Sequence, residues 1–344
     1  MKLFSFSLAY AEINMLTTEQ NTQIEAAASL LREGGVVAIP TETVYGLAAD
    51  ASNAQAVKRI FEIKGRPADH PLILHIADES QLSHWAREVP TAAKLLARQF
   101  WPGPLTLILP RSPQVSDLIS GGQDSVGVRV PDHPAALALL RAMDDEVALA
   151  APSANRYGRI SPTTAAHVYA ELGDTVDMIL DGGPCQVGLE STIVSFIGDA
   201  VSVLRPGGVP VSAIEQVLQH KVEVVDSTGA KTRVSGNVLS HYAPLTPLEL
   251  VTKKDLWKRA CELEELGLRV ALLEWSSPDE AHPHHAGIVR TSMPANAVAY
   301  GQMLYASLRQ LDNAHFDRLL AEAPPTTTEW QAVADRLKRA SYKK

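Results

Sequence analysis

The chain has 344 residues, 46% of them hydrophobic and 20% charged, and 39 acidic against 31 basic residues give a net charge of −8. This composition excludes a disordered chain, and the length predicts two domains, since single domains commonly have roughly 100 to 200 residues. The acidic balance gives no support to a dedicated nucleic-acid binder, and no apolar run is long enough for a membrane-spanning helix. Cys185 and Cys261 lie far apart without a CxxC pair, which indicates a reducing, cytoplasmic location.

Residues 1–14 are predicted to be an N-terminal extension. Residues 1–11 combine one cation, a short apolar stretch and an Ala-x-Ala ending, which resembles a secretory signal. The apolar stretch is at the bottom of the usual range of about 7 to 15 residues and contains serines. Because Met15 begins a more conventional opening, we favour an extension from an upstream start codon over a signal peptide.

From Thr17 to about residue 209 the pattern predicts helices alternating with short buried strands. Thr17 and Gln20 form a capping box, and the helix that follows ends at Gly34-Gly35. Strands are predicted at residues 36–40, 72–76, 105–109, 126–130, 147–151, 192–196 and 201–204. Helices are predicted at residues 54–63, 91–100, 134–143 and 162–172. Because the order is not a strict βα repeat, we predict an α/β fold of the α+β type, with a mixed, twisted sheet and flanking helices.

The pattern weakens from about residue 210, where an isolated strand at 222–226 and a polar, glycine-containing stretch at 227–240 suit a linker. A second α/β unit follows. Its strands are predicted at 248–251, 269–273 and 288–290, and its helices at 254–266 and 297–311. We therefore predict a catalytic domain over 15–209, a linker over 210–245 and a smaller Rossmann-like domain over 246–344.

Common catalytic motifs are missing from the sequence. It has no GxxxxGK[ST] phosphate loop, no GxGxxG after a strand, no GxSxG elbow and no HExxH. Residues 282–285 contain three histidines, but a proline interrupts them in a loop-like stretch. We interpret this tract as a solvated loop in preference to a metal site.

Cations, hydroxyls and glycine or proline turns recur where the predicted strands end, which is where ligands bind in layered α/β folds. Lys64, Arg66, Arg129 and Arg205 offer charge-assisted donors suited to a polyphosphate and a carboxylate. Each also has a purely structural interpretation: Arg129 could form a buried ion pair, and Ser161 could be an ordinary N-cap. Their combination favours a ligand site.

Residues 37–208 resemble the YrdC-like domain of threonylcarbamoyl-AMP synthases. The matching segments occur in the family's order: PTETVYGL, KGRP with a following PLILHI, WPGPLTLIL, VGVRVP, PSAN, GLESTIV and LRPGG. The KxR and SxN pairs are the most diagnostic of these. The length resembles the long form of the family, in which a linker joins a smaller C-terminal domain, and residues 240–244 resemble the end of that linker.

The resemblance implies a nucleotidyltransferase that forms L-threonylcarbamoyladenylate and pyrophosphate from L-threonine, bicarbonate or CO2, and ATP, for tRNA threonylcarbamoyladenosine modification. Mg²⁺ is expected on the ATP phosphates, without side-chain ligands. The expected partners are the substrates and the downstream tRNA threonylcarbamoyl-transfer proteins. A weak tRNA contact is compatible with this, and no membrane is involved. Because the carbamate oxygen attacks the α-phosphorus, positioning and charge neutralisation can replace a protein nucleophile.

The resemblance also implies roles for individual residues. Catalysis is expected to rest on Lys64, Arg66 and Arg129. The L-threonine site is expected to contain Thr43, His75, Arg129, Ala151 and Ser191. The ATP site is expected to contain Lys64, Arg66, His70, Ser125, Ser153, Asn155, Ser161, Arg205, Ser235 and Tyr242. Two of these depart from the family pattern: His70 stands before Pro-Leu, where the family commonly has a polar or basic residue, and Ser235 stands where the linker often has proline.

Two other functions compete with this interpretation. A hydrogenase-maturation carbamoyltransferase contains a related domain, but it should also carry an acylphosphatase-like module and cysteine-rich zinc fingers, which two lone cysteines argue against. A non-catalytic RNA-binding YrdC-like protein would use the basic concavity without chemistry. Paralogues of that kind tend to lose the KxR or SxN pair, and both pairs are present here.

Overall fold

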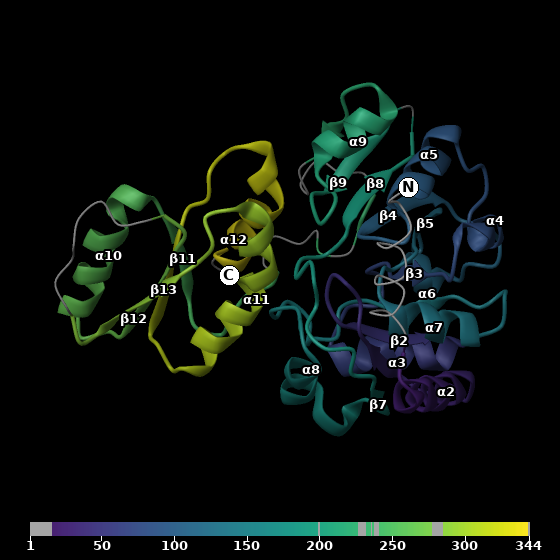
Figure 1. The fold of residues 1–344 in the computed structure, drawn as a ribbon, viewed down its shortest axis with the longest axis horizontal. Helices are drawn as coiled ribbons and strands as arrows, with labels where there is room; N and C mark the ends of the chain where they lie inside the picture. The colour runs from purple at the N-terminus through teal and green to yellow at the C-terminus, as the bar shows by residue number, and fades with distance from the viewer. Residues whose placement is uncertain are drawn as a thin grey trace, which may run out of the picture.

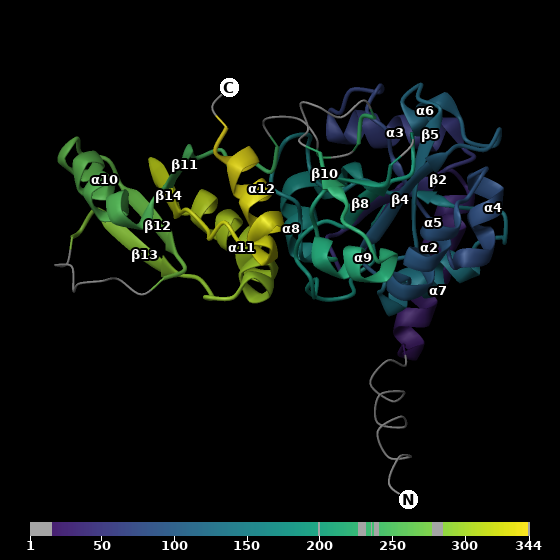
Figure 2. The same cartoon turned by 90° about the horizontal axis from the view of Figure 1, so that it is seen from above.

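The computed structural model describes residues 16–198, 200–225, 232–234, 236, 241–276 and 285–342. These residues form a larger and a smaller α/β domain that lie next to each other (Figures 1 and 2). Within these ranges, no helix has the length and apolar character needed to cross a membrane. The extension expected over residues 1–14 and the histidines at 282–284 lie outside the described residues.

A mixed sheet organises the larger domain, as the sequence predicts. Among the described residues it has ten strands, in the spatial order β10 (Glu223–Val224), β9 (Ser202–Arg205), β8 (Thr192–Ser195), β4 (Leu105–Pro110), β5 (Ser125–Arg129), β3 (Ile73–His75), β6 (Leu149–Ala150), β2 (Gly46–Asp50), β1 (Val37–Ile39) and β7 (Met178–Ile179). Parallel and antiparallel pairs are interspersed. β3 runs parallel to β5 with His75 opposite Arg129, so the ends of these two central strands meet at one place.

Helices cover both faces of this sheet (Figure 1). They are α2 (Thr18–Arg32), α3 (Ala54–Lys64), α4 (Leu82–Trp85), α5 (Thr91–Phe100), α6 (Asp117–Ser120), α7 (Pro134–Ala142), α8 (Ala165–Leu172) and α9 (Val211–Leu218), with the 3-10 helices η1 (Glu79–Gln81) and η2 (Gly173–Thr175). The capping box predicted at Thr17 and Gln20 is confirmed. α2 then buries Ile24, Ala27 and Leu31 against the domain, because these apolar residues recur at helical spacing.

The smaller domain contains a sheet of four parallel strands, in the order β11 (Leu248–Val251), β14 (Arg318–Glu322), β12 (Val270–Glu274) and β13 (Ile288–Ser292). Its helices are α10 (Lys253–Glu265), α11 (Ala297–Asn313) and α12 (Gln331–Ala340), with η3 (Thr328–Trp330). The sheet lies between α10 on one face and α11 and α12 on the other, because successive side chains of β12 point to opposite faces. Val270 and Leu272 pack with α10, whereas Ala271 and Leu273 pack with α11 and α12.

The range expected to be a linker, 210–245, contains regular structure. α9 packs against α5, and β10 pairs in parallel with β9, so the strand expected to be isolated belongs to the large sheet. The helix expected from residue 162 begins only at Ala165, because Thr164 caps it through a bond from the backbone of His167. Residues 211–224 therefore extend the larger domain.

The two domains share a partly apolar, partly ionic interface. Val44, Ile160 and Leu189 of the larger domain belong to the same buried apolar cluster as the inward face of α11. Ion pairs between described residues of the two domains accompany this cluster: Arg159–Asp312, Arg309–Glu171 and Arg336–Glu190. α11 and α12 thus contact the larger domain directly, beside the segments that follow its strands (Figure 2).

Candidate functional site

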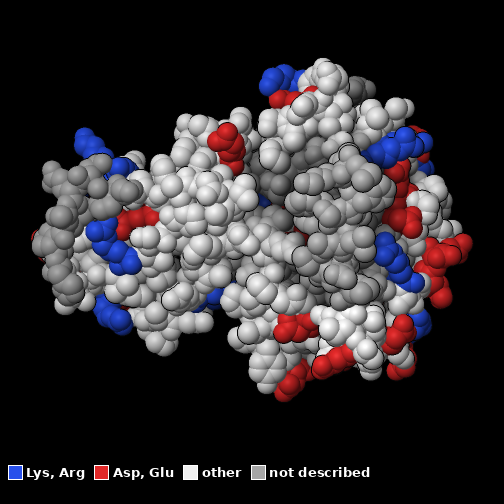
Figure 3. Space-filling view, in the orientation of Figure 1, with Lys and Arg blue, Asp and Glu red and all other residues white. Residues whose placement is uncertain are grey.

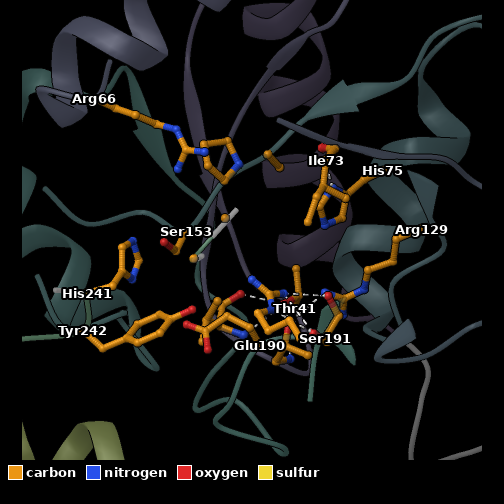
Figure 4. A pocket seen from close by; sticks show the side chains of 17 residues that line it. Thr41, Arg66, Ile73, His75, Arg129, Ser153, Glu190, Ser191, His241 and Tyr242 are labelled. Atoms are coloured by element: carbon orange, nitrogen blue, oxygen red, sulfur yellow. Dashed lines mark hydrogen bonds between the residues drawn. The ribbon is translucent and has the colours of Figure 1, made fainter. Parts of the chain in front are cut away.

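A pocket with about 510 Å³ of empty space lies where the central strands and the segments after them meet the end of the linker (Figure 4). Its lining comes from segments far apart in the sequence. The lining residues are Thr41, Thr43, Val44, Gly46, Arg66, Ile73, His75, Arg129, Ala151, Pro152, Ser153, Glu190, Ser191, Arg205, Gly236, His241 and Tyr242. Figure 4 places His75 and Arg129 on one side of the pocket, and Arg66, His241 and Tyr242 on the other.

Arg129 is fixed at its end of the pocket by three acceptors. Its Nη1 donates to Thr43 Oγ1 at 2.9 Å, its Nε donates to the Gly103 carbonyl at 3.2 Å, and its Nη2 donates to Glu42 Oε1. Both members of the Arg129–Glu42 pair are buried. The purely structural interpretation, a buried ion pair, is therefore correct for Arg129, and the same pair aims the guanidinium at a pocket.

His75 and Ser191 complete this end. Burial and the charge of Arg129 lower the pKa of His75 to about 3, so the imidazole is neutral at physiological pH. Ser191 Oγ lies 2.8 Å from Thr106 Oγ1 and accepts a hydrogen bond from Arg205 Nη2 at 3.1 Å. All the residues predicted for L-threonine therefore line one pocket.

Arg66 and Arg205 bring positive charge to the pocket. Arg66 Nη2 donates to the Pro71 carbonyl at 2.9 Å, and Arg205 donates through Nε and Nη2 to the Ser191 carbonyl at 3.1 and 2.9 Å. Burial lowers the pKa of Arg66 to about 10, which still leaves it charged at neutral pH. Among the predicted ATP residues, Arg66, Ser153, Arg205 and Tyr242 line the pocket.

Lys64, Asn155 and Ser161 support the pocket from behind. Lys64 Nζ donates to the carbonyls of Ser153 and, at 2.6 Å, of Asn155, while burial lowers its pKa well below the usual value. Asn155 Nδ2 donates to the Arg156 and Arg159 carbonyls at 2.7 and 3.0 Å. Ser161 Oγ donates to Glu190 Oε1 at 2.6 Å. In this structure the three side chains hold segments of the pocket wall.

The remaining predicted ATP residues lie elsewhere. His70 meets the ring of Tyr157 edge-on, with centroids 5.4 Å apart. Ser125 lines a second, smaller cavity together with Gly127 and Val234. Ser235 lies outside the described residues.

Glu42, Glu190 and His241 were not predicted as site residues from the sequence. Glu42 lies within PTETVYGL and Glu190 within GLESTIV, so position in a motif was the available signal. His241 is buried between Tyr157 and Tyr242, with ring centroids at 6.1 and 4.1 Å. Its burial lowers its pKa well below the usual value, which keeps a neutral ring beside the cationic side of the pocket.

The fold and the site define a two-domain α/β protein whose larger domain has a cationic pocket that the end of a linker helps to line. Comparisons with known proteins agree with this class. A Sua5/YciO/YrdC family model, described as telomere recombination, matches residues 29–207, and a model of the threonylcarbamoyl-AMP synthase C-terminal domain matches residues 209–341. The chain belongs to the threonylcarbamoyl-AMP synthase family, in its two-domain form, as the sequence predicts.

Individual relatives match over almost the whole chain. The sequence is 40% identical to a threonylcarbamoyl-AMP synthase of Bacillus subtilis over 96% of both chains. It is 38% identical to one of Pyrococcus abyssi, over 96% of this chain and 97% of the relative. A crystal structure of P. abyssi Sua5 in complex with L-threonine has a TM-score of 0.85 and 38% identity, and covers 93% of this chain and 94% of that one.

Proposed function

We propose that the protein is an L-threonylcarbamoyladenylate synthase, which forms threonylcarbamoyl-AMP and pyrophosphate from L-threonine, bicarbonate or CO2, and ATP. One observation carries this proposal: a single pocket has a fixed guanidinium, Arg129, at one end and the cations Arg66 and Arg205 elsewhere in its wall. Such a pocket suits a substrate carboxylate and a polyphosphate at once. The names of the relatives support the same activity.

Arg129 would bind the threonine carboxylate. A guanidinium has five N–H groups, and the three bonds to Glu42, Thr43 and Gly103 use one on each nitrogen. Among the described residues no acceptor takes the second N–H of either terminal nitrogen. These two donors suit bidentate binding of a carboxylate, and the P. abyssi complex with L-threonine supports this choice of ligand.

The chemistry would then need no protein nucleophile. The threonine amine adds to CO2 and loses its proton to give a carbamate, whose oxygen attacks the α-phosphorus of ATP and displaces pyrophosphate. Arg66 and Arg205 would neutralise charge on the phosphates, and neutral His75 would leave the amine without a competing cation. Binding both substrates in one pocket would accelerate the reaction further, because the reacting groups no longer have to meet by diffusion.

Mg²⁺ would be held mainly by the ATP phosphates. Glu190 is the one carboxylate among the described lining residues, and its oxygens already accept bonds from Ser161, Tyr305 and Arg336. The donor set therefore does not resemble a carboxylate cage, whereas phosphate oxygens are ordinary Mg²⁺ ligands. Bound to ATP, the ion would reduce the charge that the arginines have to neutralise.

The product would pass to the tRNA threonylcarbamoyl-transfer proteins, in the cytoplasm. Any direct contact with tRNA would be weak. Figure 3 supports this, since Lys and Arg are scattered near the rims of both domains, without a continuous basic band on the described part of that face. The net charge of −8 also argues against strong binding to the negatively charged RNA backbone.

The activity can be tested through pyrophosphate release from ATP by purified protein with Mg²⁺, bicarbonate and each amino acid in turn. We expect release that needs both threonine and bicarbonate. The absence of release under every combination would contradict the proposal and favour the RNA-binding alternative. RNA affinity measured against salt concentration would then test that alternative, because phosphate contacts make binding salt-dependent.

Gly236, at the pocket wall, offers a second test. Its φ of +82° favours glycine, and a Cβ there would lie 2.2 Å from Tyr242 Oη and 3.1 Å from Arg205 Nη1. Gly236→Ala should therefore displace this part of the linker and weaken ATP binding about tenfold, measured by titration calorimetry. Gly267→Ala is the matched control, since Gly267 has φ of +79° and open space around its Cβ position. Equal ATP affinity in both variants would contradict the proposed contact.

A further inference from the structure

The Glu190 carboxylate, in the wall of the pocket, is bound from both domains. Ser161 Oγ of the larger domain donates to Oε1 at 2.6 Å. Two donors come from the smaller domain: Tyr305 Oη on α11 at 2.9 Å and Arg336 Nε on α12 at 2.7 Å, both to Oε2. Arg336 is fully buried, so the smaller domain places a charged side chain directly behind the pocket.

Arg336 also supports the linker end. Its guanidinium carbon lies 5.2 Å from the centroid of the Tyr242 ring, which is stacked on Tyr305 with centroids 5.7 Å apart. Its Nη1 donates to Asp335 Oδ2 at 2.6 Å. One side chain therefore contacts two residues that line the pocket, Glu190 and Tyr242.

The charges around Glu190 give this contact a specific consequence. Burial alone would raise the pKa of Glu190, but the charges of Arg336 and Arg205 outweigh it and lower the pKa to about 2. The carboxylate is therefore ionised, and a buried ionised group needs a partner. If Arg336 were lost, Arg205 would be the only one of these two cations left to neutralise Glu190. Arg205 would then be drawn toward Glu190 and away from Ser191.

We propose that Arg336 is a positioning residue for the nucleotide end of the pocket: by neutralising Glu190 it keeps Arg205 on Ser191, where Arg205 can face a phosphate. The docked smaller domain is thereby part of the binding pocket. This inference rests on the proposed function, because it assumes that ATP binds on the side of Arg205 and Tyr242. Arg336 touches no substrate in this scheme and acts through Glu190.

Arg336→Met tests the inference. We expect the KM and the dissociation constant for ATP to rise about tenfold, and the KM for threonine, whose predicted site includes Ser191, to rise by a smaller factor. Arg159→Met is the matched control: it breaks another interdomain ion pair, Arg159–Asp312, without touching a residue that lines the pocket. The control should bind ATP like the unmodified protein.

The double variant Arg336→Met with Glu190→Gln separates positioning from simple docking. Removing the carboxylate charge removes the competition for Arg205, so ATP binding should recover by most of the lost factor. A variant that had merely lost interdomain contacts would not recover in this way. Titration calorimetry with ATP alone measures this without relying on turnover.

Three outcomes would overturn the inference: ATP binding by Arg336→Met equal to that of Arg159→Met, no recovery in the double variant, or an equal change in the threonine and ATP constants. If Arg336→Met fails to fold, Arg336→Gln, which keeps a donor but loses the charge, makes the same comparisons. The expected pattern of ATP affinities in a protein without threonine-dependent pyrophosphate release would support the inference and contradict only the proposed function.

Discussion

Arg129→Ala is expected to remove almost all threonine-dependent pyrophosphate release, with kcat/KM falling roughly 100- to 1000-fold. The substitution removes both N–H groups that would hold the threonine carboxylate. It also leaves the buried Glu42 carboxylate without the guanidinium that neutralises it. The other oxygen of this carboxylate, Oε2, has no hydrogen-bond partner among the described residues even before the substitution. Breaking a buried pair in this way costs about 3 to 5 kcal/mol of folding stability. Pyrophosphate release and thermal unfolding would measure the two losses separately.

A second variant separates the two losses. Arg129→Met combined with Glu42→Gln removes the charge pair as a unit, so most of the stability should return, whereas the activity should not. The control is Arg59→Met, which breaks the ion pair with Asp177 on the surface of the same domain. Near-normal turnover in Arg129→Ala, with threonine saturating at its usual concentration, would remove Arg129 from the site.

The sequence predicted the strands and helices whose signal is local. β4, β5, β8, β11 and β12 are runs of apolar residues, and each lies within a residue or so of its predicted range. β2 was missed because Gly46, Ala48 and Ala49 lack strand propensity, although small residues suit a strand that helices α2 and α3 cover closely. β7 is two residues long and exists through pairing with β1, which no local pattern shows. β10 was predicted as a strand, but its pairing with β9 was not, because a local pattern does not reveal a strand's neighbour.

The site residues likewise divide into those that a local sequence pattern predicts and those that only the folded structure brings together. Thr43, His75 and Arg129 could be predicted because each follows or ends a strand within a recognisable motif. Glu190 and its partner Arg336 are 146 residues apart and in different domains, so only the folded structure brings them together. The smaller domain carries no motif of its own, and β14 and α12 were not predicted. Its contribution lies in side chains that its packing places behind the pocket of the larger domain.

Deleting residues 235–344 is expected to lower threonine-dependent pyrophosphate release by roughly 100-fold or more, beyond the effect of Arg336→Met. The larger domain should still fold, because its main apolar cluster contains no residue of the smaller domain. The deletion would leave Glu190 without both of its α11 and α12 donors and would remove Tyr242 from the pocket. It would also expose Val44, Ile160 and Leu189 to water.

Circular dichroism during thermal unfolding would show whether the shortened chain is folded, and pyrophosphate release would give its activity. Removing only residues 343–344, which follow α12, is the control and should leave both unchanged. A shortened chain that unfolds without a cooperative transition would contradict the division into domains. A folded chain with full activity would instead contradict any contribution of Glu190's interdomain partners. Folded but inactive protein is the expected result, because the larger domain has its own apolar core, whereas the pocket also needs the end of the linker and the donors of the smaller domain.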